Sequence, residues 1–146
     1  MAQIAEVLAG KNKKVFTMDG HASVFEAIET MVANNVGSIL VTNDGALCGI
    51  FTERDYLRRI ALEGRTSRQT RLQEVMVSRL ICVDPSRSVE DCLSIMTQER
   101  IRHLPVMEEG KLAGIVSIGD LVKFICAARE MEIRYLNDYI TGKYPA

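Results

Sequence analysis

The sequence predicts an α+β fold in which two tandem β-α-β-β-α units pack as a pseudo-twofold module. Two observations lead to this prediction. The chain matches itself at an offset of 65 residues, without a gap over residues 23–56, and each copy shows the same order of strand and helix patterns. Its 146 residues, 47% of them apolar and 25% charged, suit a compact protein with a real core.

The repeat is visible in individual residues. Ser23–Val24 matches Ser88–Val89, and within the gap-free span further apolar and glycine positions coincide. Upstream, residues 4–8 match residues 72–76 at an offset of 68, because the first copy carries three extra residues around Lys11–Lys14. Such a change of length is typical of a polar loop.

In the first copy, a short extended stretch at 15–18 precedes a helix. Ser23 is the expected N-cap of that helix, whose apolar positions recur with helical spacing from Val24 to Met31. Two strands at 38–42 and 47–51 then form a hairpin around Gly45, and Thr52 opens another helix.

The second copy repeats this order. An extended stretch at 80–83 is followed by a helix capped by Ser88, a hairpin of strands 103–107 and 112–116, and a helix that begins after Ser117. The prediction therefore divides the chain into a first unit with an N-terminal helix and a linker (1–71), a second unit (72–125) and a C-terminal helical extension (126–146).

Two segments depart from the repeat: a basic stretch between the two copies and an apolar C-terminal helix. Residues 64–71 are basic and contain no apolar side chain, so they predict a linker or an exposed loop with solvated arginines. The C-terminal helix, from about Asp120 through Ile140, is richer in apolar residues than its counterpart. We expect it to support a homodimer, with packing onto its own chain as the alternative. The candidate contacts are Ile125, Met131, Leu136 and Tyr139.

The composition excludes several classes of protein. Lys and Arg number 18 against 19 Asp and Glu, so the net charge is −1 and no overall positive field exists for nucleic acid or an anionic membrane. Residues 1–8 lack the basic start of an export signal, and no apolar run is long enough to span a bilayer. We therefore expect a cytoplasmic protein with no membrane segment.

The cysteines show no metal-binding spacing. With only His21 and His103 to join them, a structural zinc site is not expected. In a reducing compartment, scattered cysteines usually act as small buried apolar residues. We expect this role for Cys48, Cys82, Cys92 and Cys126.

The candidate binding residues lie where the second strand of each hairpin meets the following helix. Thr52 and Ser117 place a hydroxyl beside the free amides of a helix start, where a phosphate could be held. Three residues on, Asp55 and Asp120 could accept hydrogen bonds from both hydroxyls of a ribose. The same residues also fit plain helix caps, and a duplication would copy caps as well.

Three segments resemble a known family. They are Thr52-Glu-Arg-Asp55 after Gly49-Ile-Phe51, Ser117-Ile-Gly-Asp120 after Gly114-Ile-Val116, and Arg102-His-Leu-Pro-Val106. They resemble the tandem cystathionine β-synthase (CBS) domain pair, or Bateman module, in its stand-alone form, and the resemblance covers about residues 4–125. It implies clefts that hold adenine nucleotides and a role in sensing or regulation without catalysis.

The resemblance also implies the binding residues. The ligand would be AMP or a related adenosine compound (ADP, ATP, NAD(H) or S-adenosylmethionine), signalling to a regulated protein that the sequence does not identify. The residues that would line the clefts are Thr17, Met18, Gly37, Ser38, Thr52, Arg54, Asp55, Cys82, Arg102, His103, Pro105, Ser117, Ile118 and Asp120.

The two clefts differ. Arg54, Arg102 and His103 would supply positive charge to a phosphate, but Gly119 stands where the first copy has Arg54. Pro105 likewise stands where the first copy has Leu40. One cleft is therefore expected to bind better than the other.

Two other functions are weighed against the sensor. One is an RNA- or DNA-binding accessory protein that uses the arginines between 54 and 71, although the chain is poor in the aromatic residues that stack on bases, with four Tyr, four Phe and no Trp. The other is a small enzyme, although no phosphate loop, nucleophile elbow or metal-ligand pattern is present in the sequence.

Overall fold

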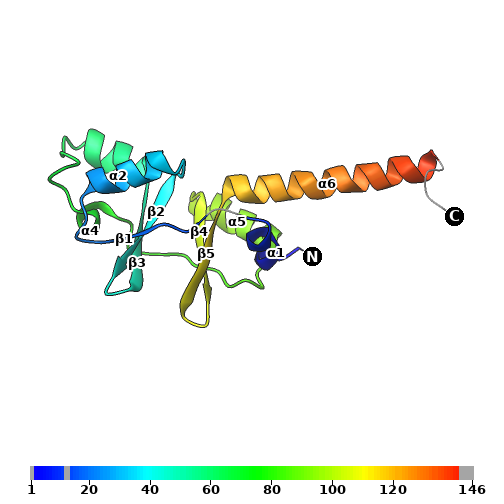
Figure 1. The fold of residues 1–146 in the computed structure, drawn as a ribbon, viewed down its shortest axis with the longest axis horizontal. Helices are drawn as coiled ribbons and strands as arrows, with labels where there is room; N and C mark the ends of the chain where they lie inside the picture. The colour runs from blue at the N-terminus through cyan, green and yellow to red at the C-terminus, as the bar shows by residue number, and fades with distance from the viewer. Residues whose placement is uncertain (1, 12–13, 142–146) are drawn as a thin grey trace. The chain divides into compact units, whose positions relative to one another are not determined.

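The computed structural model describes residues 2–11 and 14–141. It divides into two compact units (Figure 1). Unit 1 combines Met1–Asn12 with Val83–Ala146, and unit 2 is the continuous segment Lys13–Cys82. The predicted α+β class is confirmed, and each unit is built around a β-hairpin.

Unit 2 contains a three-stranded sheet in the order β1-β2-β3. β1 (Thr17–Asp19) pairs in parallel with β2 (Ser38–Asn43), and β2 pairs antiparallel with β3 (Ala46–Thr52). The hairpin turns at Asp44 and Gly45, whose φ angles of 51° and 80° are the two positive values of a type I′ turn.

Helices cover the core of unit 2. The N-cap Ser23 of α2 (Val24–Ala33) accepts the amide N–H of Glu26, and the helix buries Val24, Ala27 and Met31. After Thr52 the sequence predicted one plain helix. The structure instead has a single α-turn, α3 (Glu53–Asp55), followed by a π-helical stretch, η1 (Tyr56–Ala61), and then α4 (Leu72–Val75).

Unit 1 repeats the hairpin of unit 2. β4 (His103–Glu108) pairs with β5 (Lys111–Ser117), and the register shift at Val106/Met107 lies 65 residues after the shift at Val41/Thr42. α5 (Val89–Glu99) begins at the N-cap Ser88. The predicted strand at 80–83 is wrong, because only Val83 forms a bridge there, to Val106.

α6 (Ile118–Ile140) is one continuous helix of 23 residues, so the predicted extension at 126–146 begins inside it. Its first turns pack on unit 1, where Leu121 is fully buried. From Cys126 to Asn137 all side chains are exposed, and Figure 1 shows α6 running on past the other elements of unit 1. The described part of the helix therefore does not fold back onto unit 1.

The short helices that precede the repeats pack on the other repeat's hairpin. α1 (Ile4–Ala9) contacts β5, and α4 contacts β3. Glycines allow this approach, because a Cβ on Gly114 would lie 2.8 Å from Cδ2 of Leu8 and one on Gly49 would collide with Met76. The compact units consequently do not coincide with the segments 1–71 and 72–125 read from the repeat.

The cysteines do not share one environment. Cys92 is buried and Cys48 is half-buried, but Cys82 and Cys126 are exposed, so the expectation of four buried thiols is wrong. Burial raises the pKa of the Cys92 thiol to about 11. Within residues 2–11 and 14–141, no helix has the length and apolar character needed to cross a bilayer.

Candidate functional site

In unit 2, Thr52 and Asp55 form a reciprocal cap. Oγ1 of Thr52 accepts the amide N–H of Asp55 at 3.3 Å, while Oδ2 of Asp55 accepts the Thr52 amide at 2.9 Å and its hydroxyl at 3.1 Å. Asp55 is only 9% exposed. The carboxylate is thus already engaged by its own helix start, as the capping interpretation requires.

In unit 1, Ser117 and Asp120 repeat this cap with one addition. Asp120 Oδ2 accepts the Ser117 amide at 2.9 Å, and Ser117 Oγ accepts the Asp120 amide at 3.1 Å. The ammonium of Lys11 also lies 2.8 Å from Asp120 Oδ2 and donates to the carbonyl of Ile115 at 2.6 Å. The carboxylate of Asp120 is therefore part of an ion pair as well as a cap.

Burial and charge act on Asp120 in opposite directions. Burial raises its pKa, but the hydrogen bond and charge of Lys11, together with the amide of Ser117, outweigh this and hold the pKa below its ordinary value. The side chains of Lys11 and Asp120 are 17% and 23% exposed, so the pair is partly shielded from solvent. An acceptor that stays ionised is the stronger kind for a ribose hydroxyl.

Lys11 is the residue that sequence reasoning missed. Gly119 left the second junction without the charge that Arg54 gives the first, and Lys11 brings an ammonium to that junction from the N-terminal segment. The available signal was the set of extra residues around Lys11–Lys14. Residues 12 and 13 lie outside the described part of the chain.

The strand pairing gathers the predicted residues of unit 2 at one end of its sheet. Ser38 lies opposite Thr52, and the carbonyl of Gly37 accepts the amide of Glu53 at 3.1 Å. In β1, Thr17 and Met18 pair with the neighbouring strand at Leu40 and Val41. Arg54 is exposed on α3.

Unit 1 gathers the matching residues. His103 lies opposite Ser117, and the carbonyl of Arg102 accepts the amide of Ile118 at 2.9 Å. Pro105 is buried within β4, and its carbonyl accepts the amide of Val83, the residue after Cys82. The predicted residues thus form two groups, one in each unit, and Cys82 ends the segment assigned to unit 2.

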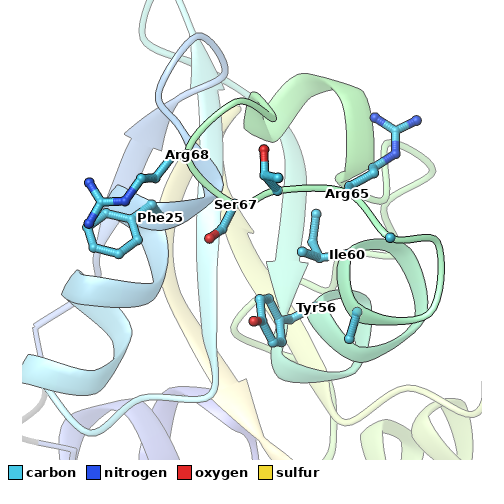
Figure 2. Close-up of a pocket in the computed structure, with 9 residues that line it drawn as sticks. Phe25, Tyr56, Ile60, Arg65, Ser67 and Arg68 are labelled. Atoms are coloured by element: carbon cyan, nitrogen blue, oxygen red, sulfur yellow. The ribbon is translucent and has the colours of Figure 1, made fainter.

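Unit 2 also contains two cavities, the second of which is bounded by Val36, Phe51 and Glu53, next to Gly37 and Thr52. One of about 370 Å³ is bounded by η1 and the loop after it, and Figure 2 shows Tyr56, Arg65 and Ser67 around it. There the guanidinium of Arg68 stacks 3.9 Å over the ring of Phe25. The other, of about 430 Å³, lies between α2 and η1. Neither is lined by a predicted site residue.

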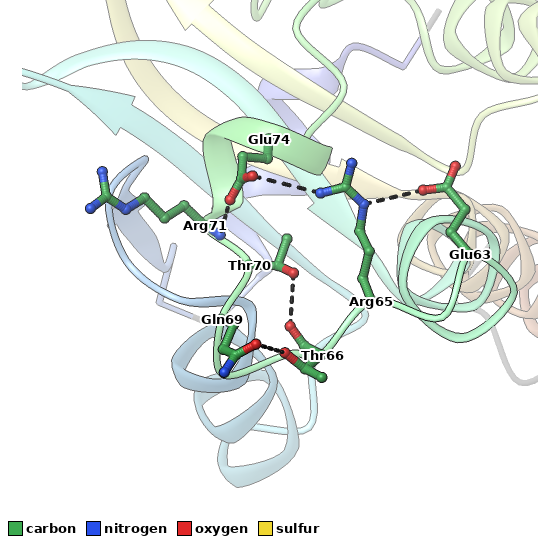
Figure 3. A network of polar contacts seen from close by, with 7 residues as sticks. All are labelled: Glu63, Arg65, Thr66, Gln69, Thr70, Arg71 and Glu74. Carbon is green, nitrogen blue, oxygen red and sulfur yellow. Dashed lines mark hydrogen bonds and ion pairs between the residues drawn. The ribbon is translucent and has the colours of Figure 1, made fainter.

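The loop at 64–71 is better ordered than a linker. Arg65 pairs with Glu63 at 3.3 Å and Glu74 at 3.6 Å, and the hydroxyl of Thr70 donates to the carbonyl of Thr66 at 2.7 Å (Figure 3). The expectation of simply solvated arginines is therefore wrong for Arg65 and for the stacked Arg68.

No group of three or more His, Cys, Asp or Glu side chains placed to hold a metal ion occurs within residues 2–11 and 14–141. The polar chemistry of this part of the chain is that of hydroxyls, carboxylates and cations at strand-to-helix junctions.

Comparison with known proteins identifies the family. The model of the CBS domain matches residues 4–62 and 72–127. The chain belongs to the CBS-domain family. The two matched segments correspond to the two repeats found in the sequence.

Individual CBS-domain proteins are similar over most of this chain. The mitochondrial protein CBSX3 of Arabidopsis thaliana is 41% identical over 127 residues, which cover 84% of this chain and 62% of that protein. A structure from Burkholderia ambifaria MC40-6, described as a candidate signal-transduction protein with CBS domains, is 40% identical with a TM-score of 0.84. That match covers 86% of this chain and 95% of the other.

A hexameric CBS-CP12 protein from bloom-forming cyanobacteria has the same fold. It is 28% identical, with a TM-score of 0.74, and the match covers 84% of this chain and 70% of that one. Self-association thus occurs in a CBS-domain protein of similar fold.

Proposed function

We propose that this CBS-domain protein is a regulatory module that binds an adenine nucleotide and signals to a partner protein without catalysing a reaction. The observation that carries the proposal is the pair of strand-to-helix junctions, each with a hydroxyl and a carboxylate in the same geometry. The similar Burkholderia protein, described as a candidate for signal transduction, supports the regulatory role.

Each junction would contact two parts of the ligand, the ribose and the phosphate. In each, the carboxylate of Asp55 or Asp120 accepts the ribose hydroxyls, and the hydroxyl of Thr52 or Ser117 faces the phosphate. The half-buried His103 and the exposed Arg102 would contact phosphate in unit 1. The remaining predicted residues would line the base and ribose.

Unit 1 is proposed as the tighter site. Asp120 is more accessible than Asp55, and Lys11 supplies a cation beside it. Binding a nucleotide there requires Asp120 to share its oxygens between Lys11 and the ribose. A carboxylate has about four lone-pair positions, so both can be satisfied.

Calorimetry with AMP tests the proposal. Asp120→Ala should weaken AMP binding about tenfold or more, because losing a hydrogen bond to a charged group costs about 1.5–3 kcal/mol. Ser88→Ala is the matched control, since Ser88 caps α5 at the same 3.1 Å distance as Ser117 caps α6 but lies outside the proposed site. It should lower stability and leave AMP affinity unchanged. If AMP affinity is unchanged in both Asp55→Ala and Asp120→Ala, these residues only cap their helices and do not bind the nucleotide.

The phosphate contacts are tested by comparing AMP with adenosine. AMP should bind more tightly, and Arg102→Ala should reduce the difference. Equal affinities of the wild type for AMP and adenosine would rule out a phosphate site. A panel with ADP, ATP, NAD(H) and S-adenosylmethionine then ranks the ligands, since bound ligand raises the melting temperature.

We also propose that the protein forms a homodimer and acts in the cytoplasm. The hexameric cyanobacterial protein supports self-association. The four free thiols support a reducing compartment. Light scattering gives the first answer, because a mass of 16.3 kDa is that of a monomer. Cell fractionation tests the cytoplasmic location. The mitochondrial fraction is the comparison, because the Arabidopsis relative is a mitochondrial protein.

A further inference from the structure

The second half of α6 exposes large apolar side chains. Ile133, Leu136 and Ile140 are 57%, 62% and 78% exposed, whereas only the first turns of the helix pack on unit 1. Large exposed apolar surface of this extent usually marks an interaction site.

These side chains follow a regular pattern. Counted from Ile118 to Ile140, the positions 118, 122, 125, 129, 133, 136 and 140 are separated by steps of 4, 3, 4, 4, 3 and 4 residues. The steps of 4, 3 and 4 repeat every 11 residues, which is close to three turns of an α-helix. At about 100° per residue, these positions therefore fall within an arc of about 80° around the helix. We call this face the α6 stripe. Its apolar members are Ile118, Val122, Ile125, Ile133, Leu136 and Ile140.

The spacing of residues in the α6 stripe is symmetric about its midpoint. Arg129 occupies its midpoint, and the steps on either side are mirror images. When two copies of α6 lie antiparallel with their Arg129 residues level, every apolar residue meets an apolar residue. Val122 of one copy faces Leu136 of the other, and Ile125 faces Ile133. This is the self-complementary surface that a closed twofold dimer requires.

The charges of α6 also favour a second copy as the occupant. In a seam formed with an unrelated apolar partner, Arg129 would face apolar side chains, and burying a charge in this way is costly. Glu132 borders the α6 stripe one turn further along the helix. In the antiparallel pair, Glu132 of each copy lies beside Arg129 of the other, so both charges are neutralised across the twofold axis.

We propose that α6 pairs antiparallel with α6 of a second copy through the α6 stripe, centred on Arg129. This inference rests on the homodimer in the proposed function and specifies its surface and its direction. Of the contacts predicted from the sequence, Ile125 and Leu136 lie on the α6 stripe. Met131 lies on a different face of the helix, about 140° from Leu136, and the side chain of Tyr139 lies outside the described residues.

A matched pair of variants tests the surface. Ile133→Glu with Leu136→Glu places two charges on the α6 stripe, and Met131→Glu with Tyr135→Glu places two charges on other faces of the same turns. The four residues are 56–62% exposed, so folding of unit 1 should be unaffected. Light scattering should give twice 16.3 kDa for the wild type and the control variant, and 16.3 kDa for the stripe variant.

The outcomes separate this inference from the proposal on which it rests. A monomeric wild type overturns both. A stripe variant that stays dimeric overturns only the surface, and dissociation of the control variant as well shows that the α6 stripe is not specific. AMP calorimetry on the stripe variant reports separately on nucleotide binding, which this inference does not need.

Disulfide formation tests the direction of pairing. In a Cys82→Ser, Cys126→Ser background, which removes the exposed native thiols, the double variant Val122→Cys with Leu136→Cys should form a covalent dimer on oxidation. Each single variant should not. The two positions are about 21 Å apart on one helix, so no bond can form within a chain. Cross-linking of either single variant with itself would indicate parallel helices and overturn the antiparallel arrangement.

Discussion

Lys11 and Asp120 combine two roles in one contact. Their ion pair ties the end of the N-terminal segment to the start of α6, and the amide of Ser117 shares the same carboxylate oxygen. Because both side chains are mostly shielded from water, the pair should contribute more to stability than an exposed surface pair does. It also sets the charge of the proposed ribose acceptor.

The lowered pKa of Asp120 predicts a loss of stability in acid. A carboxylate whose pKa is lower in the folded state stabilises the protein above its unfolded pKa of about 3.9 and loses that contribution as the pH falls through the folded value. At pH 7, Asp120→Asn should therefore lower the free energy of unfolding by about 1–3 kcal/mol. Urea unfolding from pH 7 to pH 3 should show this difference shrinking below about pH 4.

Two controls define that result. Lys11→Met should weaken the same pH dependence, because Lys11 is a main cause of the lowered pKa. Asp91→Asn, whose exposed carboxylate lies 4.0 Å from Arg87, should change stability little. A constant difference between wild type and Asp120→Asn across the whole range would contradict the assignment.

Single residues differ in how far the sequence could predict them. Ser117 and Asp120 were predictable, because a cap is a local pattern within one turn of helix. Lys11 was not, because its contacts reach a residue 104 positions away. The distinction between the buried Asp55 and the accessible Asp120 likewise depends on packing that a repeat cannot reveal.

The contact of α1 with β5 depends on the absence of one side chain. Gly114→Ala would place its Cβ 2.8 Å from Leu8, which must move, and we expect a loss of about 1–3 kcal/mol in the free energy of unfolding. Because Leu8 is a flexible side chain, Leu8→Ala in the same chain should recover part of the loss. Denaturant unfolding of the single and double variants measures both values.

Gly119→Ala is the control for this prediction. A Cβ there meets only Oγ of Ser117, at 3.6 Å, and the position lies in α6. Alanine should stabilise the helix by up to about 1 kcal/mol. If Gly114→Ala is as stable as Gly119→Ala, the close packing of α1 on β5 is not important for stability.

Hairpins and capped helices were predicted well, and elements that need distant partners were not. The turns at Gly45 and Gly110 and the caps at Ser23 and Ser88 are coded by adjacent residues. The apolar run at 80–83 fits a strand by composition, but only Val83 finds a pairing partner. The π-helical geometry of η1 was not predicted, because its residues follow an ordinary helical pattern.

The exchange of short helices gives each unit residues from both repeats. Ile4 and Leu72 are both fully buried, yet they support different hairpins. The sequence repeat showed the elements and their order, and it predicted the fold family. It could not show which hairpin each short helix packs on, because the two hairpins are alike.

Hydrogen exchange can verify this division. Ile4→Ala removes buried contacts worth about 2–5 kcal/mol and should speed amide exchange in β4 and β5 while leaving β2 and β3 protected. Leu72→Ala should have the opposite effect. Mass spectrometry of peptides from each hairpin provides the measurement. Faster exchange in the first hairpin alone after Ile4→Ala would contradict the assignment of α1 to unit 1.

The discontinuity of unit 1 has a consequence for synthesis. During synthesis α1 leaves the ribosome well before β5, which it covers, because Lys11 and Ile115 are 104 positions apart. Unit 2, made of one continuous segment, can be complete before that. Until β5 is made, Ile4 and Val7 lack the hairpin that covers them in the folded unit, so we expect them to be exposed apolar surface in the growing chain.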